Sequence, residues 1–111
     1  KAKKAIIPDS ITKGGVRYKV TSVAADAFSG CKKLKEVTIG KNIKTIGKNC
    51  FKNCHSLKKI NIRSKIFRKA GKNSLKGTNK KLIVSCNKKK MTKYKKLLKN
   101  RGNNKYKMKE K

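Results

Sequence analysis

Four cysteines and a single histidine are the residues of this 111-residue chain best suited to bind a metal or to act as nucleophiles. Cys50, Cys54 and His55 lie close together in the sequence, and Cys86 could complete a set of four zinc ligands. The Cys-x-x-Cys pair that is usual in such sites is absent, however. A catalytic cysteine would need an exposed and activated thiol. We therefore expect no metal site, no cofactor and no nucleophilic cysteine.

The spacing of the carboxylates also gives no sign of a catalytic site. Asp9, Asp26, Glu36 and Glu110 are the only four acidic residues, and they are scattered along the sequence. General acid–base chemistry needs such groups to be brought together around a substrate. Gly14-Gly15 is a turn signal and does not form a phosphate-binding motif. The sequence therefore predicts that this chain is not an enzyme.

The remaining feature that could serve a function is the high positive charge, which could bind an anionic partner. Thirty-five Lys and Arg residues against four acidic residues give a net charge of +31, and only four of the 35 are Arg. Arg suits bidentate recognition of phosphates and bases, whereas Lys is a hydrated point charge. This bias favours diffuse attraction to a polyanion, and with few aromatic residues we expect nucleic acid to bind only nonspecifically. The charge could equally serve solubility, and the sequence leaves both interpretations open.

An internal repeat indicates which elements position these side chains. Apolar residues at seven positions recur 23 residues later: Val20, Val23, Phe28, Cys31, Leu34, Val37 and Ile39 return as Ile43, Ile46, Phe51, Cys54, Leu57, Ile60 and Ile62. A third copy follows at an offset of 24, with Phe67, Ala70, Leu75, Thr78, Val84 and Cys86 at the equivalent positions and Leu82 in place of Leu57 after a one-residue shift. Such periods indicate stacked units that share one core.

Each copy has the same local pattern. Its Leu-x-x-Val/Ile-x-Ile segment alternates apolar and polar residues, as a half-buried strand does, and equivalent strands would align into a parallel sheet with rungs about 4.8 Å apart. The Ala-Phe-x-x-Cys segment suits one helical turn. Cys31 and Cys54 occupy the same position in successive rungs, so we expect buried free thiols, with a Cys31–Cys54 disulfide as the alternative.

The two full copies, residues 20–39 and 43–62, resemble the BspA-like class of leucine-rich repeats. The resemblance implies a leucine-rich repeat solenoid, with short stacked parallel strands, helical turns and about three rungs of 23–24 residues. We predict one domain, 1–111, with a lead-in strand segment (1–19), repeats at 20–42, 43–65 and 66–87, and a helix–strand cap (88–111). The resemblance also implies the C-terminal portion of a secreted bacterial surface protein, extracellular or on the cell surface, that adheres to host or cell-wall components.

The C-terminal segment has a different pattern. Met91, Tyr94, Leu97 and Leu98 recur at helical spacing with lysines between them, and Tyr106 and Met108 then alternate with lysines as a closing strand would. We expect this helix to cover the end of the third rung. A helix lying on an anionic membrane surface is the alternative. No run of 18 apolar residues exists, so we expect no membrane insertion.

With catalysis disfavoured, the polar face of the predicted sheet becomes the candidate binding surface. Its candidate residues are Lys35, Lys58, Lys59, Asn61 and Arg63. Solenoids use such extended faces to bind partners. We predict a monomeric, non-catalytic interaction module whose partner is a protein, an anionic glycan or a cell-wall polymer. A structural spacer or cap, or a nonspecific polyanion binder, is the alternative.

Overall fold

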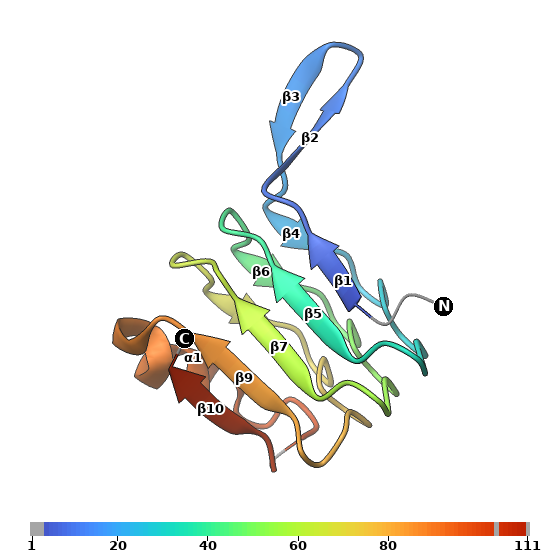
Figure 1. Cartoon of the computed structure of the whole chain (residues 1–111), viewed down its shortest axis with the longest axis vertical. Coiled ribbons are helices and arrows are strands. Elements are labelled where there is room, and N and C mark those ends of the chain that lie inside the picture. The colour runs from blue at the N-terminus through green and yellow to red at the C-terminus, as the bar shows by residue number, and fades with distance from the viewer. Residues whose placement is uncertain (1–3, 104, 111) are drawn as a thin grey trace.

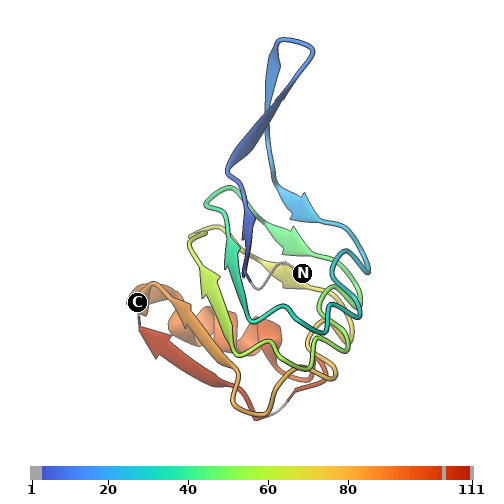
Figure 2. The same cartoon turned by 45° about the vertical axis from the view of Figure 1, so that its right-hand side comes forward.

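The computed structural model describes residues 4–103 and 105–110, and in it the chain forms two parallel sheets that face each other across a narrow core (Figures 1 and 2). The larger sheet has the order β1-β5-β7-β9-β10, with β1 at Lys4–Ile7, β5 at Glu36–Ile39, β7 at Lys59–Ile62, β9 at Ile83–Cys86 and β10 at Lys107–Glu110. The smaller sheet has the order β4-β6-β8, with strands at Ser22–Val23, Thr45–Ile46 and Lys69–Ala70.

Strand pairing confirms the alignment of the repeats. In the larger sheet Val37 pairs with Ile60 at an offset of 23, and Ile60 pairs with Val84 at an offset of 24. In the smaller sheet Ile46 pairs with Ala70, again at an offset of 24. The chain therefore forms a leucine-rich repeat solenoid, as the sequence predicts.

The core is a column of equivalent side chains stacked from rung to rung. Leu34, Leu57 and Leu82 are 3%, 0% and 0% exposed. The Phe28 and Phe51 rings stack with their centroids 5.6 Å apart, and Phe28 is only half-buried because it lies in the first of the stacked turns. Each rung therefore buries its apolar side chains mainly against its neighbours.

The segments that join the two sheets are successive tight turns, where the sequence suggested a single helical turn. Asn49 and Asn53 have positive φ values of 58° and 62°, and two left-handed residues four positions apart prevent a continuous helix. Bonds such as Lys52 N–H to the Asn49 carbonyl (3.1 Å) and Cys54 N–H to the Phe51 carbonyl (3.2 Å) close successive turns. Other amides point along the stack, as when Phe51 N–H donates to the Ser74 carbonyl at 3.0 Å. Hydrogen bonds therefore connect the rungs on this side as well.

The predicted cap is confirmed at the end of the third rung. A 3-10 turn (Lys88–Lys90) leads into α1 (Met91–Leu98), and β10 pairs in parallel with β9. Tyr94 of α1 is fully buried, its ring meets that of Phe67 edge to face at 5.4 Å, and its hydroxyl donates to the Ser64 carbonyl at 2.7 Å. In the described part of the chain, no helix has the length and apolar character needed to cross a membrane.

A β-hairpin projects beyond the two sheets (Figure 1). It consists of β2 (Ser10–Lys13) and β3 (Val16–Lys19), and Gly14 and Gly15 form its two-residue loop with φ values of 59° and 79°. Glycine suits this loop because a hairpin turn of this kind needs positive φ at both central positions. These residues belong to the lead-in segment that the sequence predicts at 1–19, and the projecting hairpin is a finding of the structure.

Candidate binding surface

The outer face of the larger sheet carries two rows of side chains that run across all five strands. One row consists of Lys4, Glu36, Lys59, Ile83 and Lys107, and the other of Ile6, Thr38, Asn61, Ser85 and Lys109. The alternating positions, such as Val37, Ile60 and Val84, are buried in the core. Strand alternation thus places four lysines and one carboxylate on a single face.

Asn61 lies at the centre of this face, and its amide is already hydrogen-bonded within the sheet. The amide nitrogen donates to Glu36 Oε2 at 2.9 Å, and the amide oxygen accepts from the Ser85 hydroxyl at 2.7 Å. Asn61 and Ser85 are each 5% exposed. Asn61 therefore links three strands and forms part of the floor of the surface.

The exposed candidate residues lie at the two ends of the strands. Lys35, Lys58 and Lys59 are exposed where β5 and β7 begin, and the Lys35 carbonyl accepts the amides of Lys58 and Lys59 at 3.0 and 3.2 Å. Arg63 follows β7, roughly 13 Å further along the strand at about 3.3 Å per residue. The structure thus brings Lys35, Lys58, Lys59 and Asn61 together and places Arg63 at the other, C-terminal end of the strands.

Two lysines of the cap extend the surface. Lys107 and Lys109 of β10 are exposed and are registered with Ile83 and Ser85. Together with Lys58 and Lys59, Lys109 lines a shallow hollow of about 330 Å³ that has Asn61 among its lining residues. The sequence analysis predicted the closing strand but did not assign its lysines to this face. Their alternation with Tyr106 and Met108 was the available signal.

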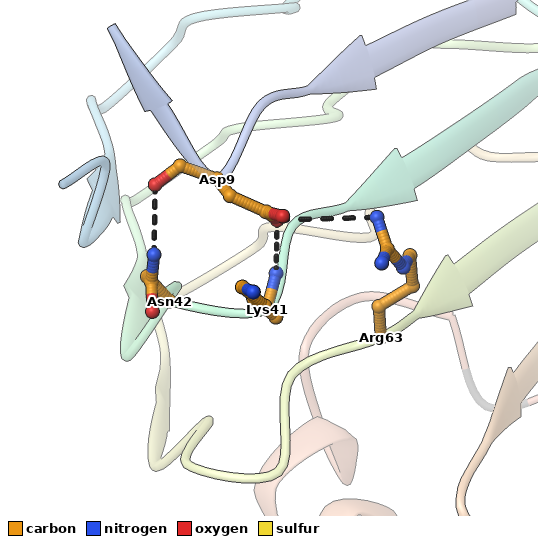
Figure 3. Close-up of polar contacts among 4 residues, drawn as sticks. All are labelled: Asp9, Lys41, Asn42 and Arg63. Carbon is orange, nitrogen blue, oxygen red and sulfur yellow. Dashed lines mark hydrogen bonds and ion pairs between the residues drawn. The ribbon is translucent and has the colours of Figure 1, made fainter.

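At the C-terminal ends of the strands, Asp9 connects the base of the hairpin to the next two rungs (Figure 3). Its carboxylate Oδ1 accepts the backbone amide of Lys41 at 2.8 Å and lies 3.9 Å from the Arg63 guanidinium. Its backbone carbonyl accepts from the side-chain amide of Asn42 at 2.8 Å and from the amide of Val20 at 3.0 Å. These contacts hold the start and the end of the hairpin against the turn that follows β5.

Gly40 allows this close contact. A Cβ atom at this position would lie 2.5 Å from the Ile7 carbonyl oxygen and 3.0 Å from Asp9 Oδ1. The first of these distances is too short for a carbon–oxygen contact, so only glycine lets the two backbones approach in this way. The orientation of the hairpin base is therefore set by backbone packing as well as by Asp9.

The four cysteines are free thiols, and three of them are fully buried. Burial raises the pKa of Cys50 to about 12, with a further contribution from neighbouring Cys54, and burial also raises the pKa of Cys54 and of Cys86. His55 is exposed, and the described residues contain no cluster of three or more His, Cys, Asp or Glu side chains placed to hold a metal ion. The Cys50, Cys54, His55 and Cys86 set is therefore not assembled as a metal site here.

We expect the thiols to differ strongly in reactivity. Cys31 is only half-buried and should be alkylated first, whereas Cys50 should react very slowly. Near pH 8, a thiol with a pKa of about 12 is ionised roughly a thousandfold less than one with a pKa of 9.0. Iodoacetamide labelling of the native protein, followed by peptide mass spectrometry, measures this order. The control is labelling in denaturant, where all four should react alike, and rapid native labelling of Cys50 would contradict the assignment.

Comparisons with known proteins agree with the stacked-repeat fold. A family model described as "BspA type Leucine rich repeat region (6 copies)" matches residues 3–104. The structure of a leucine rich cell surface protein from Faecalibacterium prausnitzii A2-165 is similar, with 28% sequence identity and a TM-score of 0.68, and the match covers 75% of this chain and 23% of that one.

A leucine-rich repeat protein from Bacteroides ovatus ATCC 8483 shares the fold, with 24% identity, a TM-score of 0.56 and coverage of 73% of this chain and 29% of that one. This chain therefore spans less than a third of either structure. None of the curated protein sequences matches it.

Proposed function

Because this chain belongs to the BspA-type leucine-rich repeat family, we propose that it is a non-catalytic interaction module of a bacterial surface protein. The similar protein from Faecalibacterium is described as a cell surface protein, which supports an extracellular or cell-surface location for this chain too. Within such a protein, the module would bind a host or cell-wall component. The scattered carboxylates and the buried thiols support a role without catalysis.

The outer face of the larger sheet is the surface that we assign to this binding. The observation that carries the proposal is the group of three lysines, Lys59, Lys107 and Lys109, on the same face as the hydrogen-bonded pair Asn61 and Ser85. Floor groups that are already paired hold the face in one shape, so little ordering cost remains for the backbone when a partner binds.

The chemistry of this face favours an anionic partner. Lys58 and Lys59 line a hollow of about 330 Å³, and Lys35 is exposed nearby. Glu36 on the same face is engaged by Asn61, and the exposed Glu110 is the one carboxylate among the described lining residues of the hollow, against three lysines. With a net charge of +31, long-range attraction would bring any polyanion towards the chain. Specificity must then come from the arrangement of cations on this face. An acidic protein surface and an anionic glycan or cell-wall polymer both fit.

Paired substitutions of equal charge test the assignment. We expect the double variant Lys58→Gln and Lys59→Gln to bind heparin, as a model anionic polymer, about tenfold more weakly at roughly 0.15 M salt. Two exposed ion pairs at about 0.7 kcal/mol each account for that factor. The matched control replaces Lys69 and Lys72 by Gln, which removes the same charge from exposed positions on and beside β8 of the smaller sheet. We expect the control to lose less than twofold, as measured by isothermal titration calorimetry.

The two alternatives give different results in the same experiment. Equal losses in both double variants would show diffuse polyanion binding, in which exposed lysines contribute alike wherever they lie on the surface. Binding of the unmodified chain that disappears above about 0.05 M salt would instead leave a spacer or cap role. Either result would contradict the assigned face.

A further inference from the structure

A second cationic site lies at the base of the projecting hairpin, away from the hollow on the sheet. An open cleft of about 490 Å³ separates the hairpin from the turn that follows β5, and its lining consists only of polar and charged residues: Asp9, Ser10, Arg17, Lys19, Lys41 and Asn42. This volume falls within the range of small-molecule sites, about 300–1,000 Å³. We infer that this cleft binds the oxyanion group, a sulfate ester or a carboxylate, of an acidic saccharide.

Hairpin pairing determines which side chains belong to the cleft. Ser10 pairs with Lys19, and Thr12 pairs with Arg17, so these four residues share one face of the hairpin. Ile11, Val16 and Tyr18 share the other face, where they are 51%, 51% and 52% exposed. One polar face of the hairpin is thus turned to the cleft.

The cations in the cleft are held without being neutralised. Arg17 Nε donates to the Ser10 hydroxyl at 3.1 Å, which orients the guanidinium while its two terminal nitrogens remain available to a ligand. Asp9, the carboxylate in the lining, is occupied by the Lys41 amide and by Arg63. Three cationic side chains, those of Arg17, Lys19 and Lys41, therefore face one engaged carboxylate.

The walls of the cleft are fixed relative to each other. The bond from the Asn42 side chain to the Asp9 carbonyl joins the hairpin base to the rung that carries Lys41 (Figure 3). The bond from the Val20 amide to the same carbonyl and the close packing of Gly40 reinforce it. Arg17, Lys19 and Lys41 thereby line one cleft before any ligand arrives. An oxyanion placed between them would be attracted by all three, and the fixed walls would limit the ordering cost of binding.

The composition of the lining favours a saccharide over other anions. No aromatic side chain lines the cleft, and Tyr18 lies on the opposite hairpin face, so bases of a nucleic acid would find no surface to stack on. Among the described residues, the cleft also has no apolar lining residue to anchor a protein side chain, which is what protein interfaces rely on. The Ser10 hydroxyl and the Asn42 amide oxygen can instead bond sugar hydroxyls, and Arg17 offers the fork that oxyanions prefer.

A disaccharide is a small probe, and NMR follows its binding at the cleft and at the sheet face separately, residue by residue. We expect a sulfated disaccharide and an unsulfated uronic-acid disaccharide to bind the intact chain in NMR titrations, and a neutral disaccharide not to bind. Arg17→Gln should weaken binding of both acidic disaccharides about tenfold. Lys41→Gln should do the same, and it lies outside the hairpin, so it cannot act by unfolding it.

Two controls make the result decisive. Arg68→Gln removes an equivalent exposed charge just before β8 and should change the affinity less than twofold. As the second control, the amide shifts of Lys41 and Asn42 report on the cleft and those of Lys59 and Asn61 on the sheet face, so failure of one site is told apart from failure of the other. Equal losses in Arg17→Gln and Arg68→Gln would overturn the inference. So would inorganic sulfate binding as tightly as the sulfated disaccharide, or tighter binding of a short oligonucleotide or an acidic peptide.

Discussion

Replacing Leu57 by aspartate should unfold the whole chain. Leu57 is fully buried in the central rung, where it continues the column between Leu34 and Leu82. An unpaired carboxylate at this position costs several kcal/mol, against a total stability of roughly 5–15 kcal/mol for a domain of this kind. Because each rung depends on its neighbours, loss of the middle one also removes support from both ends.

Circular dichroism and thermal melting measure this effect. Lys58→Asp is the matched control, since it places the same charge at the adjacent exposed position, and it should melt within a few degrees of the parent chain. If Leu57→Asp kept the native spectrum and melting temperature, the stacking of rungs through this column would be wrong.

Truncation after Asn87 should be the second most damaging change. It removes α1 and β10, and with them the Tyr94 contacts to Phe67 and Ser64 and the parallel partner of β9. Deleting one buried aromatic side chain costs about 3–5 kcal/mol, which lowers the melting temperature by about 4–8 °C per kcal/mol in a chain of this size. We therefore expect a loss of more than about 10 °C.

The truncated chain should also associate. Its last rung would expose apolar residues, and the unpaired edge of β9 would be a template for another strand. Analytical ultracentrifugation measures the association. Lys93→Ala, on the exposed face of the same helix, is the control and should stay monomeric with unchanged melting. A monomeric truncated form that melts like the intact chain would refute the cap and favour a helix that serves a membrane surface.

The regular part of the fold could be predicted because its signal is local and periodic. Val23, Ile46 and Ala70 occupy matching positions in the sequence, and they pair as neighbours in the structure. The stripe of Met91, Tyr94 and Leu98 similarly identified the cap helix. In both cases the sequence spacing alone places the apolar side chains on one face.

The hairpin and the burial of Asn61 could not be predicted from the periodicity of the sequence alone. Ile11 and Tyr18 repeat nowhere else in the chain, so they carried no rung signal, although the Gly14-Gly15 turn between alternating residues indicates a hairpin. Alternation correctly placed Asn61 on the outer face. Its burial could not be inferred, because this depends on Glu36 and Ser85 of neighbouring strands.

The most direct test of the account is an NMR titration of the intact chain with a sulfated hexasaccharide, which is long enough to reach across several strands. We expect the largest amide shifts around Lys58, Lys59 and Lys109 on the outer face of the larger sheet, with separate shifts at the hairpin cleft. We expect only small shifts in β8 and α1, although these also carry exposed lysines. Shifts spread evenly over all lysine-bearing elements would contradict a shaped binding surface.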